Sequence, residues 1–331
     1  IQNASQTYVG ANATINADAV QSGDGGKVIV WGNNTTQFYG TITARGGASG
    51  GNGGFVETSG KNFLDVDGAR VNAQAPFGTA GTWLLDPTNI TVVTAGANAT
   101  AAQVATFAAA DVGGAGQSKV DPTTLNAAGA NVILQAQNDI TVTDAINLIT
   151  TANANLTLQA GRSIAVNNSV ATNGTGNITM VANNTDNTET NAAGGALTGS
   201  GGTNRVAGAA TLTIGGTIST GAGGNIKLVN SATAANGGVT GALIVNNAIT
   251  TANRATSGTT GAVTLTAGGA IALNANVTTG NTTVADAAGA QAPASGSITL
   301  RAGTNITGTG RLITGNAALT GASAGGADTV T

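Results

Sequence analysis

Short phrases of alternating apolar and polar residues return along the second half of this chain. They occur at Val132-Ile133-Leu134, Leu156-Thr157-Leu158, Ile178-Thr179-Met180, Val263-Thr264-Leu265 and Ile298-Thr299-Leu300. Alternation at period 2 is typical of strands, because successive side chains point to opposite faces. Repetition about every 20–40 residues indicates a solenoid. A solenoid of strands is a parallel β-helix, with the first and third residue of each phrase facing inward.

A second phrase accompanies the first, and it reads apolar-x-apolar, three residues, apolar. It occurs at Ile140/Val142/Ile146, Ile164/Val166/Val170, Leu212/Ile214/Ile218, Leu243/Val245/Ile249 and Ile271/Leu273/Val277. The gap between the two phrases widens before Leu212 and before Leu243. Both insertions are therefore expected to leave the coil at the same corner.

The N-terminal part repeats a different motif, which also alternates like a strand and recurs along the chain. GGKVIVW spans 25–31, GGFVETSG spans 53–60, and LLDPTN spans 84–89. When the phrases are aligned, one face carries no charge and is the expected core side. That face consists of Val28, Val56 and Trp83, followed by Val30, Thr58 and Leu85.

These patterns predict an all-β chain folded as a right-handed parallel β-helix of roughly ten to twelve coils, with one short helical excursion. Coils are expected over 1–92 and 131–331, with inserted loops near 183–210, 231–241 and 280–296. Residues 93–130 are expected to form the excursion: a helix over Ala99–Val112, then a turn or second helix at Asp121–Leu125. Partner recognition is expected on 183–210 and 93–130, because solenoid insertions often form the binding face.

Composition narrows the possible chemistry. Charged residues make up 8% of the chain, Gly 52 of 331 residues, and there is no Cys or His. Thiol chemistry and Cys/His metal sites are thereby excluded, and a net charge of −3 argues against nucleic acid. The nearest approach to a basic cluster is Lys27, Arg45, Lys61 and Arg70, interpreted as solvated corners of successive coils. We predict no catalytic, cofactor-binding or metal-binding residue.

A polysaccharide-processing enzyme is the main alternative, because β-helices often host lyases and hydrolases. Asp65 and Asp67 share one side of a strand, with Glu57 one coil edge away, so a paired-carboxylate glycosidase is conceivable. Aromatic residues make up only 3% of the chain, so few side chains are present on which the sugar rings of a substrate could stack. The favoured interpretation is that both aspartates are solvated acids on an outer face.

Two further interpretations depend on repeated side chains. The Thr-x-Thr pairs Thr41/Thr43 and Thr141/Thr143 do not recur in every coil, which disfavours an ice-binding solenoid. The sequence Gly-Gly-x-Gly-x-Asp does not repeat at a fixed period, which disfavours a calcium-binding solenoid. Asn-x-Thr triplets begin at Asn89, Asn155, Asn177 and Asn305. They match N-glycosylation acceptors, but a corner Asn before an apolar-Thr-apolar strand creates the same triplet, and we favour that structural origin.

The ordered series over about residues 20–92 resembles a known family. GKVIVW, TQFYG at 36–40, ARGG at 44–47, GGFVETSG and LLDPTNIT at 84–91 are similar to the large two-partner-secretion exoproteins, namely filamentous-haemagglutinin-like proteins and high-molecular-weight adhesins. Beyond residue 131 the likeness is the generic coil pattern. The family's secretion module is not recognisable, so the chain resembles the shaft that follows it.

This resemblance implies an extracellular or outer-surface location on a Gram-negative bacterium, export through an outer-membrane pore partner, and roles in attachment, aggregation or biofilm. The expected function is the structural shaft of an adhesin or surface fibre, with no enzymatic activity, no cofactor and an unknown host receptor. A filament-forming matrix protein that stacks end to end remains open, because neither Tyr8–Ile15 nor Ala317–Thr320 carries a capping signature.

Overall fold

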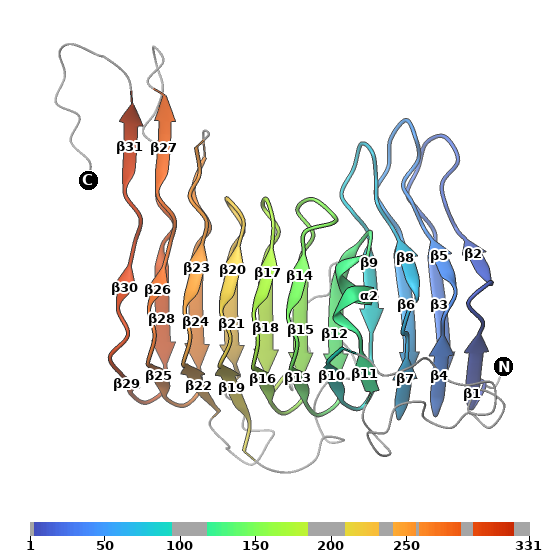
Figure 1. The fold of residues 1–331 in the computed structure, drawn as a ribbon, viewed down its shortest axis with the longest axis horizontal. Coiled ribbons are helices and arrows are strands. Elements are labelled where there is room, and N and C mark those ends of the chain that lie inside the picture. The colour runs from blue at the N-terminus through green and yellow to red at the C-terminus, as the bar shows by residue number, and fades with distance from the viewer. Residues whose placement is uncertain are drawn as a thin grey trace.

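Parallel strands stack into three long columns, which makes the chain a parallel β-helix (Figure 1). The computed structural model describes residues 3–94, 118–184, 209–231, 241–255, 258–285 and 294–320. Each coil adds one strand to each column in turn, and neighbouring strands within every described sheet are parallel, as β12 with β15 and β13 with β16 illustrate. The predicted all-β fold class is confirmed.

The first column is a nine-stranded sheet built from the first phrase of each coil. Its strands are β3 (Lys27–Gly32), β6 (Phe55–Gly60), β9 (Thr82–Leu85), β12 (Asn131–Ala136), β15 (Leu156–Ala160), β18 (Ile178–Ala182), β21 (Ile226–Asn230), β24 (Val263–Ala267) and β28 (Ile298–Ala302). Leu156 stacks between Val132 and Ile178, so equivalent residues of the phrase lie directly above one another. Together with the preceding partial coil of β1 and β2, the described residues make ten coils.

The second column holds the first part of the second phrase. A three-stranded sheet contains β1 (Gln6–Val9), β4 (Thr35–Phe38) and β7 (Phe63–Asp65). An eight-stranded sheet follows with β11 (Ser118–Val120), β10 (Ile90–Val92), β13 (Ile140–Val142), β16 (Ile164–Val166), β19 (Thr211–Ile214), β22 (Ala242–Val245), β25 (Ile271–Leu273) and β29 (Ile306–Thr307). Both insertions predicted from the widened gaps run from the first to this second column, before β19 and before β22.

The third column is divided into two sheets. The first contains β2 (Thr14–Asn16), β5 (Thr41–Thr43) and β8 (Arg70–Asn72). The second contains β14 (Ile146–Leu148), β17 (Val170–Thr172), β20 (Ile218–Thr220), β23 (Ile249–Thr251), β26 (Val277–Thr278) and β30 (Leu312–Ile313), and beyond it β27 (Thr282–Ala285) pairs with β31 (Ala317–Thr320). A short helix, α2 (Pro122–Asn126), lies between the two sheets (Figure 1).

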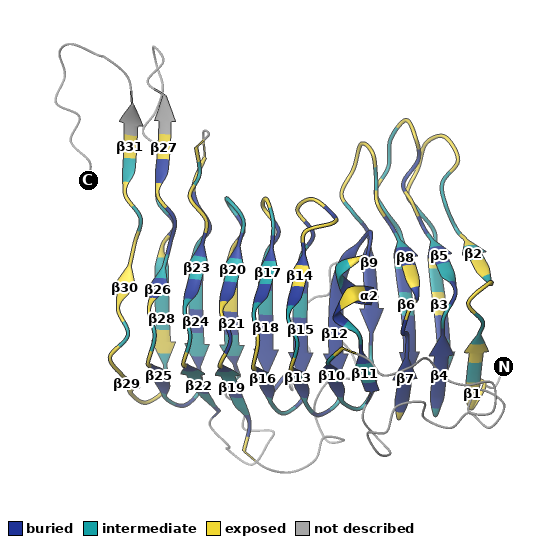
Figure 2. Cartoon of the chain, viewed as in Figure 1, coloured by how far each residue is buried: buried dark blue, intermediate teal, exposed yellow. Residues whose placement is uncertain are grey.

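The apolar core runs inside the columns. Figure 2 shows that the strands around it are buried except toward the two ends of the described stack. Every inward residue predicted in the C-terminal phrases belongs to the core or packs against it; Val132, Leu158 and Met180 are 0% exposed. Ile298 and Leu300 are only partly buried, because β28 has a strand neighbour on one side alone among the described residues. The predicted N-terminal core face is also confirmed, since each of its residues is buried except Val28, which is partly buried against the core.

The segment 118–130 belongs to the stack, although 93–130 does not read as coils in the sequence. Strand β11 pairs with β10 and contacts β7, so the second column holds one more strand here than the first column. Helix α2 then takes the place of a third-column strand against β14. The Asp121 side chain caps it by accepting a hydrogen bond from the Thr123 N–H. This is the second predicted helix. Ala99–Val112 and most of the predicted loops at 183–210 and 231–241 lie outside the described residues. The predicted loop at 280–296 is wrong over its start, because Thr282–Ala285 forms β27 and pairs with β31.

Asparagine side chains join successive coils at the entry to the first column. Asn131 Oδ1 accepts hydrogen bonds from the backbone N–H and from Nδ2 of Asn155, and Asn155 Oδ1 accepts the same two bonds from Asn177. Asn177 Oδ1 accepts the Asn225 N–H, and Asn225 Oδ1 accepts the Ala262 N–H. We call these four asparagines the asparagine ladder. It continues the backbone hydrogen bonding of the column into the corner.

Candidate functional site

The carboxylates that suggested an enzyme are buried rather than solvated. Asp65 is 1% exposed and Asp67 is 5% exposed, which corrects the expectation of an open outer face. Asp65 Oδ2 accepts a hydrogen bond from the Tyr39 hydroxyl at 2.7 Å, and Asp67 Oδ1 accepts the Asp121 N–H at 3.2 Å. Burial and these carboxylates raise the pKa of Tyr39 far above its usual value. Asp67 thus joins the stack to 118–130, and Asp65 holds Tyr39 and accepts the Asp67 N–H beside it.

Glu57 does not join these aspartates, because it lies on the outer face of β6 in the first column. Its neighbour is Asp86, which follows β9 one rung away. Burial raises the pKa of Asp86 to about 8, and the negative charge of Glu57 adds to the shift. Burial also raises the pKa of Glu57, opposed by a hydrogen bond from Ser59 and by the charge of Lys27. In the part of the chain that the structure describes, no group of three or more acidic residues is arranged to hold a metal ion.

The four basic residues that lie nearest to one another in the sequence, Lys27, Arg45, Lys61 and Arg70, do not form one cluster in the structure. Lys27 Nζ lies 5.4 Å from the centre of the Phe55 ring, on the outer face of the first column. Lys61 is exposed after β6. Arg45 and Arg70 instead lie beside two cavities on the third column, about 550 and 400 Å³ in volume.

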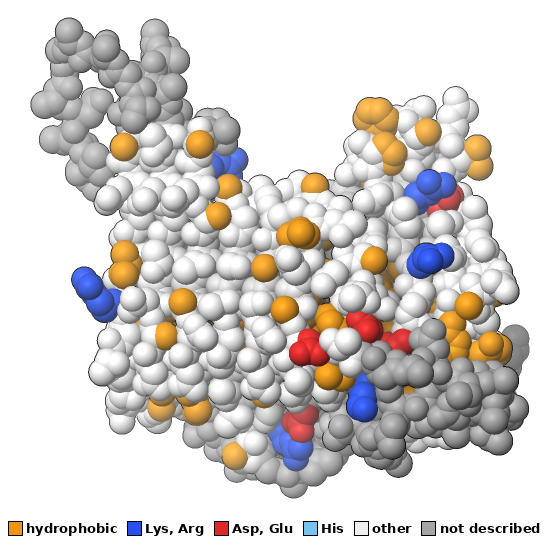
Figure 3. Space-filling model, viewed as in Figure 1, with side chains coloured by type: hydrophobic (Ala, Val, Ile, Leu, Met, Phe, Trp, Pro, Cys, Tyr) orange, Lys and Arg blue, Asp and Glu red, His pale blue; other side chains and the backbone are white. Residues whose placement is uncertain are grey.

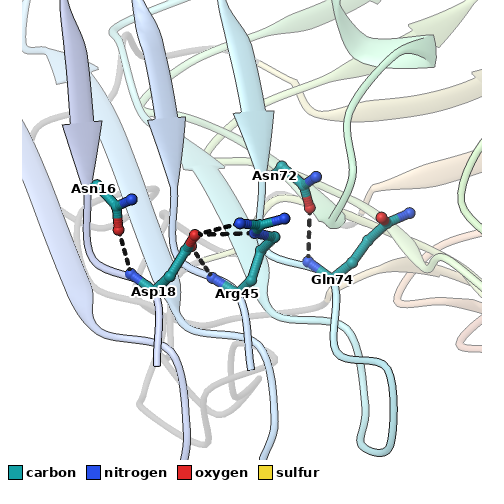
Figure 4. Close-up of polar contacts among 5 residues, drawn as sticks. All are labelled: Asn16, Asp18, Arg45, Asn72 and Gln74. Atoms are coloured by element: carbon teal, nitrogen blue, oxygen red, sulfur yellow. Dashed lines mark hydrogen bonds and ion pairs between the residues drawn. The ribbon is translucent and has the colours of Figure 1, made fainter. Parts of the chain in front are cut away.

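The first cavity is built on a row of equivalent residues. Asp18, Arg45 and Gln74 each stand two positions after a strand of the first third-column sheet (Figure 4). Arg45 donates from Nε and Nη2 to Asp18 Oδ2 at 2.9 and 2.8 Å, and its backbone N–H donates to Asp18 Oδ1. Burial alone would raise the pKa of Asp18, but the hydrogen bonds from Arg45 outweigh it and hold that pKa below its usual value. The polar side chains around this cavity are Asp18, Arg45, Asn72, Gln74, Thr151 and Asn153.

The second cavity adjoins the first and shares three of its residues: Asn72, Gln74 and Thr151. Arg70 stands at its edge, exposed and without an ion pair to any described residue. Gln74 Nε2 reaches across to Thr151 Oγ1 at 3.3 Å and so links β8 to the turn after β14. We call the two cavities together the break groove, because they lie where the third column is divided.

Long turns form one wall of the break groove. The turns after β2, β5 and β8 rise above those of the middle coils (Figure 1). The close stacking of these turns requires glycine at Gly51, which has φ +118° and whose added Cβ would collide with the Gly23 carbonyl. Pro76 and Gly78 line the first cavity, and Phe77 between them is 73% exposed. Charged side chains are sparse on the face of the molecule that Figure 3 shows.

Sequence reasoning did not find the break groove. One available signal was the row Asp18, Arg45 and Gln74, which recurs at equivalent positions of successive coils. The groove itself has no local signal, because it exists only where 118–130 returns to the stack.

The remaining motifs have structural positions. Thr141 stacks on Thr91 but also on Ala165, so the threonine column stops after two rungs. Asn155 and Asn177 are rungs of the asparagine ladder with their amide nitrogens donating, which supports a structural origin of those triplets. Asn89 Oδ1 accepts the Asp139 N–H at 3.2 Å, and Asn305 is exposed.

No protein-family model matches this chain, and a search of curated proteins finds no similar sequence. Within the described residues, no helix has the length and apolar character needed to cross a membrane.

Proposed function

We propose that this chain is the structural shaft of an extracellular bacterial adhesin or surface fibre. The observation that carries the proposal is the first column, where nine parallel strands stack in register over one continuous apolar core. In a solenoid each repeat contacts only its neighbours, so the architecture extends along one axis and suits a spacer. The asparagine ladder adds side-chain hydrogen bonds between coils along that axis. The shaft needs no catalytic step.

The resemblance of residues 20–92 to two-partner-secretion exoproteins supports the rest of the proposal. It implies a shaft outside a Gram-negative cell, exported through an outer-membrane pore partner, with a role in attachment, aggregation or biofilm formation. The low charge of 8% and the absence of Cys are compatible with a secreted repeat protein that needs no disulfide.

The test uses antibodies raised against the purified chain on intact cells of the bacterium that encodes it. Surface labelling without permeabilisation, together with weaker attachment or aggregation after deletion of the encoding sequence, is the expected result. Labelling that appears only after lysis contradicts the location. Normal attachment and aggregation in the deletion strain contradict the adhesive role.

A further inference from the structure

We propose that the break groove is a binding site for an acidic oligosaccharide, one that contains uronic acid or another carboxylated sugar. The inference goes beyond the shaft role and does not depend on it, because it concerns a site on the folded chain in solution. The first observation is the position of the groove in the third column. In the described residues, the third column changes from regular strand stacking to α2 at this one place between β8 and β14. The two cavities of 550 and 400 Å³ lie there.

The charge of the groove is opposite to that of the chain. The whole chain has a net charge of −3, whereas the charged residues lining the two cavities are Asp18, Arg45 and Arg70, which sum to +1. The carboxylate of Asp18 already uses its oxygens on Arg45. Arg45 nevertheless keeps 54% of its side chain exposed, and Arg70 has no ion pair among the described residues. Guanidinium groups bind carboxylates with paired hydrogen bonds, so an anionic ligand is favoured.

The uncharged lining matches sugar hydroxyl groups. Asn72 and Asn153 each use Oδ1 to accept a backbone N–H, which leaves their amide nitrogens as donors. Gln74 donates from Nε2 to Thr151, which leaves Gln74 Oε1 as an acceptor. They come from both sides of the groove: Asn72 and Gln74 belong to the rung of β8, Asn153 follows β14, and the segment 126–129 lies between them. Donors and acceptors on both sides of the groove suit a ligand with many hydroxyl groups.

Phe77 adds an apolar surface on the turn beside the first cavity, between Pro76 and Gly78. The ring is 73% exposed on the turn whose neighbours line the first cavity, in a chain with only 3% aromatic residues. An exposed aromatic ring costs solvation free energy unless a partner covers it. The apolar face of a pyranose ring is such a partner.

Two other ligand classes fit less well. An extended peptide binds by adding a strand to a free sheet edge, but these edges are occupied: Gly129 pairs with Asn72 of β8, and Asn126 Oδ1 accepts the Asn147 N–H of β14. Nucleic acid binding requires many phosphate contacts from Lys and Arg, and this groove has a net charge of +1. The oligosaccharide remains the ligand that uses every feature of the groove.

The test is isothermal titration of the full 331-residue chain with a hexamer of galacturonic acid, and with cellohexaose as a neutral hexamer. We expect saturable binding of the acidic hexamer that weakens as ionic strength rises from about 0.01 M to about 1 M. Cellohexaose should bind about tenfold more weakly or not at all. Arg70→Gln and Phe77→Ala should each weaken binding of the acidic hexamer about tenfold. Lys61→Gln, which removes an exposed charge outside the groove, should leave it unchanged.

A second measurement maps the site on the wild-type chain. The acidic hexamer should protect Arg45 and Arg70 from modification by phenylglyoxal, while Arg311, exposed on the last described coil, stays reactive. Absence of binding, equal binding of a glutamate hexamer, or equal protection of Arg311 would overturn the proposal. Binding unaffected by both groove variants would also overturn it. None of these outcomes depends on where the protein is located in the cell.

Discussion

At the scale of single residues, position along a strand decides whether a charge is tolerated. Leu158 and Thr157 are neighbours on β15, yet Leu158 is 0% exposed in the core and Thr157 is partly exposed on the outer face. The same alternation explains why Glu57 on β6 can be charged while Val56 cannot: Val56 is 0% exposed.

Leu158→Asp is expected to lower the free energy of unfolding by several kcal/mol, because it buries a charge without a partner. Thr157→Asp should change it by less than about 1 kcal/mol, since surface substitutions usually have small effects. Urea denaturation of both variants measures the difference. Equal shifts would show that the inward face is wrongly assigned.

Asp86 makes stability depend on pH. The folded protein holds the Asp86 proton up to a pKa of about 8, whereas the ordinary pKa of an aspartate side chain is about 3.9. Between about pH 4 and about pH 8 the folded state therefore binds more protons than the unfolded state, and the free energy of unfolding falls as the pH rises. Asp86→Asn should reduce this slope and raise stability at pH 8 on the order of 1–3 kcal/mol, less than the full shift implies because Asp86 remains partly exposed.

The control is Asp144→Asn. Hydrogen bonds with Thr94 lower the pKa of Asp144, so that group titrates below pH 4 and the variant should keep the slope between pH 5 and 8. Chemical denaturation at several pH values gives both slopes. An unchanged slope in Asp86→Asn would contradict the assignment.

At the scale of elements, corners contribute as well as strands. Each corner of the asparagine ladder satisfies backbone N–H groups that a turn would otherwise leave to water. Asn155 is the central example, because its side chain both donates to Asn131 and accepts from Asn177.

Asn155→Ala is expected to lower the free energy of unfolding by about 1–3 kcal/mol, since it leaves partly buried partners unsatisfied on two coils. Asn147→Ala is the matched control, because Asn147 is exposed on β14 and should change stability by less than about 0.5 kcal/mol. Thermal and urea unfolding both report the comparison. Similar losses in the two variants would mean that the ladder contributes nothing specific.

At the scale of the whole molecule, stability is a sum over neighbouring coils. Val132 stacks on Leu156 and Leu156 on Ile178, and the second and third columns repeat this register at Ile164 and Val170. Removing one complete coil should thus bring matching residues together.

Deletion of 155–176 is expected to leave a cooperatively folded β protein that is one rung shorter. Deletion of 155–166 removes β15 and β16 but leaves β17, so strands of different columns would meet and folding should fail. Far-UV circular dichroism and small-angle X-ray scattering distinguish the two outcomes. Failure of the complete-coil deletion would argue against independent, stackable coils.

The sequence by itself determined the coil order, the inward face and the corner at which both insertions leave. These depend on local alternation and on one repeated phrase, as Leu156, Leu158 and Ile164 illustrate. Only the tertiary structure decided that Asp65 and Asp67 are buried, that β11 lies between β7 and β10, and that α2 divides the third column beside Arg70 and Gln74. The physical reason is the distance along the chain over which the interactions act. The alternation within a strand is visible in a few consecutive residues. The burial of an outer face instead depends on a segment that returns from far along the chain, as the hydrogen bond between Asp67 and Asp121, 54 residues apart, shows.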